Sequence, residues 1–239
     1  MTMLQIKKIS KSIKGKKIVS NITFSVESGE VFGLLGPNGA GKTTIFYIIA
    51  GLMNCDNGKI ILSNKTISNI SMHNRSKLGI NYLPQEPSIF QNLTVYENLY
   101  GLAELSFSCK KDIRNFIDNS IEEFNLSEIC NLKGRQLSGG QRRKVEIART
   151  LAAKPNIILL DEPFAGIDPI AIEDIKNVLK NLLKKDIGIL ITDHNVRETL
   201  EMCHKAAIIN NGEIIAKGNK ESLINDNMVK KVYLGNMYK

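Results

Sequence analysis

The sequence predicts an α/β fold built on a parallel sheet flanked by helices, and three observations lead to it. Apolar runs of strand length, separated by helical stretches, lie at Ile157–Leu160, Ile187–Thr192 and Ala206–Ile209, an alternation typical of a parallel sheet. Residues 4–35 have the pattern of short strands. Residues 92–135 show helical periodicity with little clustering of β-branched residues, which indicates a separate helical lobe.

A strand, a glycine-rich turn and a helix follow one another near the N-terminus. Val19–Val26 alternates apolar and polar side chains with period two, as in a half-buried strand. Val31–Leu35 is a continuous apolar run, as expected for a central strand covered on both faces. After the glycine-rich turn, Thr44–Ala50 is an apolar helical stretch that Gly51 ends.

Two local signals mark later elements. Thr94 and Glu97 have the spacing of a capping box, which predicts that a helix begins after Thr94. Helical periodicity then continues to about Leu132. Near the end of the chain, Asn211-Gly212 separates two short apolar runs and predicts a tight β-hairpin.

Composition and length favour an ordinary globular protein. The chain has 239 residues, of which 43% are hydrophobic and 23% charged, enough for one well-buried core. No apolar run approaches the roughly 18–20 residues of a membrane-spanning helix, and Met1–Lys8 lacks the apolar segment of a secretory signal. We therefore expect a cytosolic protein whose membrane role, if it has one, comes through a partner.

The charge and the cysteines exclude some partners. The formal net charge is +8, but the lysines are spread along the chain without interleaved aromatic residues, so we expect a solvated surface and no nucleic acid. Attraction to anionic lipid is the second interpretation. The cysteines form no Cys-x-x-Cys pair, which favours free thiols over a metal site; they are Cys55, Cys109, Cys130 and Cys203.

The glycine-rich turn fits the P-loop pattern. It lies between a strand and a helix, as phosphate binding by backbone N–H groups at a helix N-terminus requires, so an accidental glycine-rich match is disfavoured. Lys42 would reach the β- and γ-phosphates of a nucleotide, Thr43 would offer its hydroxyl to Mg²⁺, and Thr44 would lie near the α-phosphate. The remaining P-loop residues are Gly36, Pro37, Asn38, Gly39, Ala40 and Gly41.

A buried strand ends in two carboxylates. The run Ile157–Leu160 is followed by Asp161 and Glu162, and a parallel strand delivers such residues to the carboxyl edge of the sheet, beside the P-loop. Asp161 is predicted to hold Mg²⁺. Glu162 is predicted to orient or deprotonate an attacking water. The alternative is that the two carboxylates only cap a helix after the strand. That alternative would not explain why they occur together with a P-loop.

A second glycine-containing turn precedes another helix. Leu137-Ser138-Gly139-Gly140-Gln141 stands before the predicted helix Arg142–Ala153. The hydroxyl of Ser138 and the amides of the two glycines would form another anion-binding helix N-terminus. The alternative is a capped helix start with no ligand.

These three motifs, in the chain order P-loop, Leu137–Gln141 and the strand that ends in Asp161 and Glu162, resemble the ABC ATPase family over essentially the whole chain. The resemblance implies one ABC ATPase domain over residues 1–239, with a P-loop NTPase core at residues 4–87 and 136–239. It also implies an N-terminal antiparallel β subdomain within this core and a helical subdomain inserted at residues 88–135. ATP and Mg²⁺ are the implied ligands.

The resemblance assigns further roles at matching positions. Gln85 matches a glutamine that reaches Mg²⁺ and the attacking water, and His194 matches a histidine that contacts the γ-phosphate. Asp168 matches a loop that communicates between subunits, although it also has the sequence of a helix N-cap before Pro169. Two chains would share each ATP, with Ser138, Gly139, Gly140, Gln141 and Asp168 contacting the ATP of the partner. The chain carries one set of these motifs, so a homodimer is expected.

One position departs from the family. An aromatic residue usually stacks on adenine upstream of the P-loop, and the matching residue here is Ile13. The resemblance therefore implies apolar contact with the base without ring stacking.

Stretches outside the nucleotide motifs resemble the ATPases of lipopolysaccharide-export transporters; they are 82–90, 164–170, 192–200 and 232–235. This implies two membrane subunits as partners, a peripheral place on the cytoplasmic face of the inner membrane, and Phe90 as an apolar anchor for them. The alternative for Phe90 is a contact that only fixes the following helix.

Alternative functions are the ATPase of a branched-chain amino-acid importer and, more remotely, an ABC protein acting on ribosomes or DNA. A P-loop kinase or GTPase would leave Leu137–Gln141 unexplained.

Overall fold

The central sheet has six strands in the order β10-β9-β3-β8-β7-β6. The structure is a computed structural model that describes residues 3–234. The strands of the central sheet pair in parallel from β9 to β6, and β10 pairs antiparallel with β9. Every residue of β3, β7 and β8 is buried, as the continuous apolar runs predicted. The strands are β3 (Val31–Leu35), β6 (Ile80–Leu83), β7 (Ile157–Asp161), β8 (Gly188–Thr192), β9 (Lys205–Asn210) and β10 (Glu213–Gly218).

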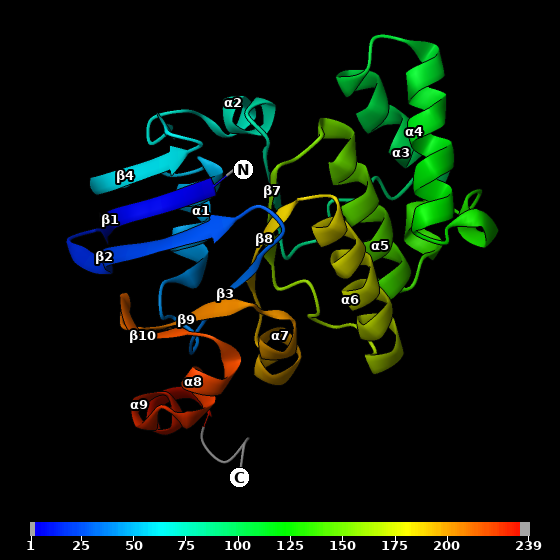
Figure 1. Ribbon diagram of the computed structural model, residues 1–239. Coiled ribbons are helices and arrows are strands. Elements are labelled where there is room, and N and C mark those ends of the chain that lie inside the picture. The colour runs from blue at the N-terminus through cyan, green and yellow to red at the C-terminus, as the bar shows by residue number, and fades with distance from the viewer. Residues whose placement is uncertain (1–2, 235–239) are drawn as a thin grey trace.

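A smaller antiparallel sheet, β2-β1-β4-β5, covers one side of the molecule. Helix α1 (Lys42–Ala50) lies between the two sheets (Figure 1), and its buried residues share one apolar cluster with both of them. The antiparallel N-terminal sheet that the resemblance implied is confirmed. Its strands are β1 (Met3–Ile13), β2 (Lys16–Glu27), β4 (Asn57–Leu62) and β5 (Lys65–Thr66).

Helices cover the opposite face of the central sheet (Figure 1) and form a second apolar cluster with it. They are α3 (Val95–Ser106), α4 (Lys110–Glu123), α5 (Gly139–Thr150) and α6 (Pro169–Lys184), with short 3-10 helices at Ser127–Ile129, Gly134–Gln136 and Leu151–Ala153. Helices α3 and α4 stand out from the core (Figure 1); the bounds 88–135 expected for a helical subdomain remain a prediction. The helix predicted at Arg142–Ala153 begins earlier, at Gly139, because Ser138 caps it, and its last residues are 3-10 helical.

The C-terminal elements pack on the remaining edge of the sheet. The predicted hairpin is confirmed: Asn211 and Gly212 join β9 to β10 with φ angles of 47° and 80°, as this turn type requires. The Gly212 N–H donates to the Ala40 carbonyl at 3.0 Å, and the Gly212 carbonyl accepts from the Ser20 N–H at 2.8 Å. The remaining helices are α2 (Met72–Lys77), α7 (Val196–Met202), α8 (Lys220–Asn225) and α9 (Asn227–Val229), followed by a π-helical turn at Lys230–Leu234.

Arg75 of α2 is fully buried at the end of α1. Its guanidinium donates to the carbonyls of Ile48 at 2.6 Å, Ile49 at 2.7 Å, Ser68 at 2.7 Å and Ile70 at 2.8 Å. Burial lowers the pKa of Arg75 to about 10. The cation therefore closes the C-terminal end of the helix that follows the P-loop.

Within residues 3–234, no helix has the length and apolar character needed to cross a membrane. Two sequence-based expectations reach beyond these residues. The absence of a secretory signal concerns a segment that starts at Met1, and the resemblance of the tail includes Gly235; both of these residues lie outside the described part of the chain.

Candidate active site

The P-loop turns from β3 into α1 and lines a cleft of about 300 Å³. Gly36 is required there, because a Cβ atom on it would lie 2.1 Å from the carbonyl oxygen of Ile209. Gly41, with φ of 103°, precedes α1 without a side-chain cap, so the first N–H groups of α1 are available to an anion. The lining residues are Ile18, Asn38, Gly39, Ala40, Gly41, Lys42, Thr43, Thr44, Glu162 and His194.

Lys42 is buried and held by the P-loop itself. Its Nζ donates to the carbonyl oxygens of Gly36 at 2.7 Å and Pro37 at 3.0 Å. Burial lowers the pKa of Lys42, and the charges of Glu162, Asp161 and Asp193 oppose this shift. An ammonium group in this position can exchange its carbonyl partners for phosphate oxygens.

The apolar wall of the cleft differs from the expectation. Ile18 lines it, whereas Ile13 lies at the end of β1, opposite Lys16, with 37% of its surface exposed. The structure does not bring Ile13 to the cleft wall. Several register shifts between β1 and β2 decide which residue of this hairpin faces the P-loop, and such irregularities have no simple sequence signal.

The two carboxylates after β7 occupy different surroundings. Asp161 is buried and accepts a hydrogen bond from the Tyr82 hydroxyl at 3.0 Å. Burial raises the pKa of Asp161, the Tyr82 hydrogen bond lowers it, and the charge of Glu162 raises it. Glu162 has a left-handed φ of 47°, and its N–H donates to the Thr192 carbonyl at 2.8 Å. The sequence did not single out Tyr82, which comes from the neighbouring strand β6.

Glu162 and His194 form a close pair across the cleft. The Glu162 Oε1 atom lies 2.6 Å from His194 Nε2, with the His194 side chain 49% exposed and that of Glu162 9% exposed. The other carboxylate oxygen, Oε2, is buried without a hydrogen-bond partner among the described residues. Because buried carboxylate oxygens are normally hydrogen-bonded, Oε2 is a place for a polar group of a bound substrate or water.

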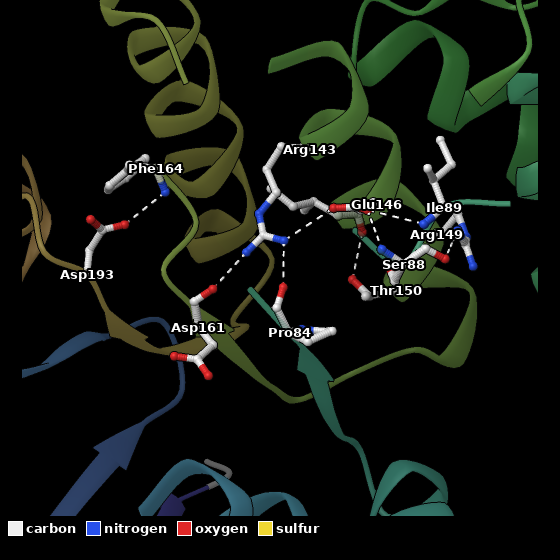
Figure 2. Close-up of polar contacts among 11 residues, drawn as sticks. Pro84, Ser88, Ile89, Arg143, Glu146, Arg149, Thr150, Asp161, Phe164 and Asp193 are labelled. Atoms are coloured by element: carbon white, nitrogen blue, oxygen red, sulfur yellow. Dashed lines mark hydrogen bonds and ion pairs between the residues drawn. The ribbon is translucent and has the colours of Figure 1, made fainter. Parts of the chain in front are cut away.

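Arg143 of α5 ties the strand end to the loop that contains Gln85 (Figure 2). It donates to the carbonyls of Asp161 at 3.1 Å and Pro84 at 2.9 Å, and it forms an ion pair with Glu146 at 3.2 Å. Burial lowers the pKa of Arg143, and the charge of Glu146 opposes the shift. Gln85 itself is exposed just beyond β6 and is not among the residues that line the cleft.

Two further residues of α5 hold the next part of this loop (Figure 2). Glu146 accepts hydrogen bonds from the N–H groups of Ser88 at 2.7 Å and Ile89 at 3.2 Å. Arg149 donates to the Ser88 carbonyl at 3.0 Å, and its guanidinium carbon lies 4.7 Å from the centroid of the Phe90 ring. The loop between β6 and α3 is therefore fixed to the same helix that Ser138 begins.

Phe90 is tied down by its backbone and exposed at its ring. The Asn98 side chain accepts from the Phe90 N–H at 2.9 Å and donates to the carbonyls of Phe90, Leu93 and Thr94. The Phe90 residue is 50% exposed. A groove of about 350 Å³ lies beside it, lined by Leu52, Met72, Tyr82, Leu83, Pro84, Ser88, Leu102, Glu146, Arg149 and Thr150.

Ser138 caps α5 on an exposed surface away from the cleft lining. Its Oγ accepts from the Gln141 N–H at 3.2 Å, and Gln141 Oε1 accepts from the Ser138 N–H at 3.0 Å. Gly140 permits close packing, since a Cβ atom on it would lie 2.4 Å from the Ala171 Cβ. Gly139 is exposed. Within one chain, the structure does not bring Ser138 together with Lys42.

Asp168 is confirmed as the N-cap of α6, with its side chain accepting from the Ala171 N–H at 2.9 Å. Pro169 is the first residue of that helix. The neighbouring Ile170 is 82% exposed. Ile170 lies near the start of α5 in space, since the next residue, Ala171, packs against Gly140.

Comparisons with known proteins agree with this geometry. The family model described as ABC transporter matches residues 19–165. The lipopolysaccharide export system ATP-binding protein LptB of Haemophilus influenzae is 52% identical over the full length of both chains. LptB of Escherichia coli K12 is 48% identical over 98% of both.

Solved structures are also similar to this chain. One is the ATP-binding cassette of an ABC transporter in its ADP conformation, with a TM-score of 0.88, 30% identity, and coverage of 98% of this chain and 99% of that one. Another is a dimeric cassette in a post-hydrolysis state bound to ADP and phosphate, with a TM-score of 0.79, 25% identity, and coverage of 91% and 98%.

Proposed function

We propose that this chain, which belongs to the ABC transporter family, hydrolyses ATP to drive export of lipopolysaccharide from the inner membrane toward the outer membrane. The observation that carries the proposal is the full-length likeness to LptB at 52% identity. The cleft between the P-loop and the Glu162–His194 pair supports the ATPase part independently, since phosphate-binding and water-handling groups face one space.

The P-loop residues are assigned to the triphosphate. The uncapped N–H groups of α1 and the ammonium of Lys42 would bind the β- and γ-phosphates. Thr43 and Thr44 line the same cleft. Ile18 gives an apolar wall that is available to the base, and Ile13, on the same hairpin, is proposed as a further apolar contact of the adenine.

The residues at the carboxyl edge of the sheet fit a Mg²⁺ ion. Tyr82 takes Oδ2 of the buried Asp161, so the other oxygen is the donor proposed for the metal, with the Thr43 hydroxyl and Gln85. Mg²⁺ is usually bound through one or two carboxylates together with phosphate oxygens and waters, and this set supplies one carboxylate. When bound, the ion would neutralise charge on the phosphates.

Glu162 and His194 are assigned to the hydrolytic step. The unpaired Oε2 of Glu162 is placed to accept a proton or a hydrogen bond from the attacking water. His194 holds Oε1 at 2.6 Å, which fixes the orientation of the carboxylate, and its exposed ring faces the cleft where the γ-phosphate would lie. These groups act by positioning and by electrostatic stabilisation.

A homodimer would complete the site. One chain offers the P-loop in the cleft and Ser138 on a separate exposed surface, so a head-to-tail pair of such surfaces would place two ATP molecules between two chains. Gly139, Gly140, Gln141 and Asp168 would lie at the same contact.

Two integral membrane subunits are the proposed partners, which places the assembly on the cytoplasmic face of the inner membrane. The half-exposed Phe90 ring and the adjoining groove are suited to a short amphipathic helix of such a subunit. The ATPase of a branched-chain amino-acid importer remains the second candidate, because its nucleotide site would be built in the same way.

The test is to express the chain with an affinity tag, purify its membrane partners with it and identify them by mass spectrometry. We expect lipopolysaccharide-export permeases. In vesicles that contain the purified assembly and lipopolysaccharide, ATP should release the lipid to an added acceptor protein, and the Glu162→Gln assembly should not. Recovery of amino-acid permeases with ATP-dependent uptake would replace this function by the importer.

A further inference from the structure

Asp193 is a buried carboxylate at the end of β8 that the roles above do not use. It lies between Thr192 and His194 and is 2% exposed. Its Oδ2 accepts from the Phe164 N–H at 2.9 Å (Figure 2), and its Oδ1 accepts from the Asn195 N–H at 2.8 Å. Burying a carboxylate costs free energy unless it is hydrogen-bonded. These two accepted hydrogen bonds therefore indicate that the carboxylate is retained for the contacts it makes with the two loops.

The two N–H groups belong to the two loops that carry the reactive pair. Phe164 follows Glu162 in the turn after β7, and Asn195 directly follows His194. The turn after β7 is closed by the Ala165 N–H, which donates to the Glu162 carbonyl at 3.2 Å. One rigid side chain thus fixes both loops from inside the protein.

The Glu162 loop needs such a restraint. Glu162 has a φ of 47°, a conformation that costs free energy in a non-glycine residue and persists only where the surroundings enforce it. Its backbone N–H is already bonded to the Thr192 carbonyl, adjacent to Asp193. A displacement of about 1 Å in a reacting group can cost about 10²-fold in rate.

We propose that Asp193 is a positioning residue that sets the distance and orientation between Glu162 and His194 by anchoring both of their loops. The proposal rests on the hydrolytic roles proposed for those two residues. Asp193 is not among the residues that line the cleft. Its effect is expected on the rate of hydrolysis and not on ATP affinity.

The experiment compares Asp193→Asn with wild type in the purified full chain. The amide keeps the shape, but its NH2 group would face one of the two N–H donors, so one anchor is lost. We expect kcat to fall by about 10-fold to 10²-fold, with KM and the ATP dissociation constant changed by less than about threefold. Asp118→Asn on the exposed face of α4 is the matched control and should match wild type.

A double-mutant cycle separates positioning from general loss of structure. If Asp193 acts through His194, Asp193→Asn should lower kcat much less in a His194→Ala background than in wild type. Equal losses in the two backgrounds would overturn the proposal. A selective loss of ATP affinity would overturn it too, since Asp193 would then act through the charge of Lys42.

Two further arms keep the outcome interpretable. Asp193→Ser, which can accept one of the two hydrogen bonds, replaces the Asn variant if that protein does not fold, and kcat is expressed per chain that binds ATP. Glu162→Gln tests the underlying role: full ATPase activity in that variant would refute the proposed hydrolytic site. An inactive Glu162→Gln together with a wild-type kcat in Asp193→Asn would refute only the positioning role.

Discussion

Replacement of Arg75 by Met should destabilise the protein strongly, although Arg75 lies outside the active site. Met has a similar length and fills a similar space, but it has no donors. The side chain of Arg75 donates to four carbonyl groups. Of these, the structure gives only the Ile48 carbonyl another partner within residues 3–234, the Gly51 N–H at 3.3 Å. The substitution therefore leaves the buried carbonyl of Ile49 and the partly buried carbonyls of Ser68 and Ile70 without a hydrogen-bond partner among the described residues.

The magnitude follows from these groups. A buried polar group that loses its partner costs about 1–3 kcal/mol, which applies in full to the Ile49 carbonyl and only in part to the partly buried carbonyls of Ser68 and Ile70; the three together cost roughly 2–5 kcal/mol. Removal of a buried cation offsets part of this cost, because burial penalises the charged form and lowers the pKa of Arg75 to about 10. We expect a net loss of about 2–3 kcal/mol in the free energy of unfolding.

Urea denaturation followed by circular dichroism would measure this loss. Arg75→Lys should fall between wild type and Arg75→Met, because an ammonium group has three donors and cannot reach all four carbonyls. Arg114→Met, at an exposed position of α4, is the control and should change the free energy of unfolding by less than about 0.5 kcal/mol. A loss below 1 kcal/mol in Arg75→Met would refute the assignment of these carbonyls to Arg75.

Three predictions concern function. Glu162→Gln should keep ATP binding and lower steady-state hydrolysis by roughly 10²-fold or more, with an ATP-bound dimer accumulating on size-exclusion chromatography; near-normal hydrolysis would refute the role of Glu162. Ser138→Arg should bind ATP but not hydrolyse it alone, and mixtures with Lys42→Ala chains should recover at most one intact site per heterodimer; full activity of the Ser138 variant by itself would contradict a shared site. Phe90→Ala should leave the melting temperature and ATP binding nearly unchanged. Its free energy of association with the membrane subunits should weaken by about 2 kcal/mol or more, which co-purification would show as a loss of these subunits. Lost stability without a specific loss of partner binding would instead favour a structural role for Phe90.

Local signals in the sequence were sufficient where a structure depends on neighbours along the chain. The caps at Thr94, Ser138 and Asp168 and the hairpin at Asn211-Gly212 are all present. Each depends on hydrogen bonds or dihedral angles within a few residues. The apolar strands were also found, because burial on both faces leaves a continuous hydrophobic run.

The long-range interactions that fix the active site and the far end of α1 could not be predicted in the same way. Asp193 bonds to Phe164, 29 residues away, and Arg75 bonds to Ile48, 27 residues away. In both contacts the partner is a backbone group, the Phe164 N–H or the Ile48 carbonyl. Almost every residue carries such groups. The sequence therefore contains no complementary residue type that would reveal the pair.

The residue of the irregular β1–β2 pair that lines the cleft could not be predicted from the sequence either. Ile18 lines the cleft, and it lies where the register between β1 and β2 shifts, from Lys11 opposite Val19 to Ser12 opposite Lys17. A shift of one residue turns a side chain to the other face of a sheet. Period-two reasoning alone cannot locate such a shift.

The hairpin between β9 and β10 affects how ATP binding is linked to the folding stability of the whole protein. Gly212 connects the P-loop at Ala40 to β2 at Ser20, and Lys42 is already seated on P-loop carbonyls. The loop is thus ordered when the chain folds, and ATP need not supply the entropy of ordering it. Occupancy and folding are then linked by mass action: ATP at 100 times its dissociation constant would add about 2.7 kcal/mol to stability. The resting ATP pool of a cell would in this way act as a folding ligand, and a chain deprived of nucleotide would be the one exposed to proteolysis.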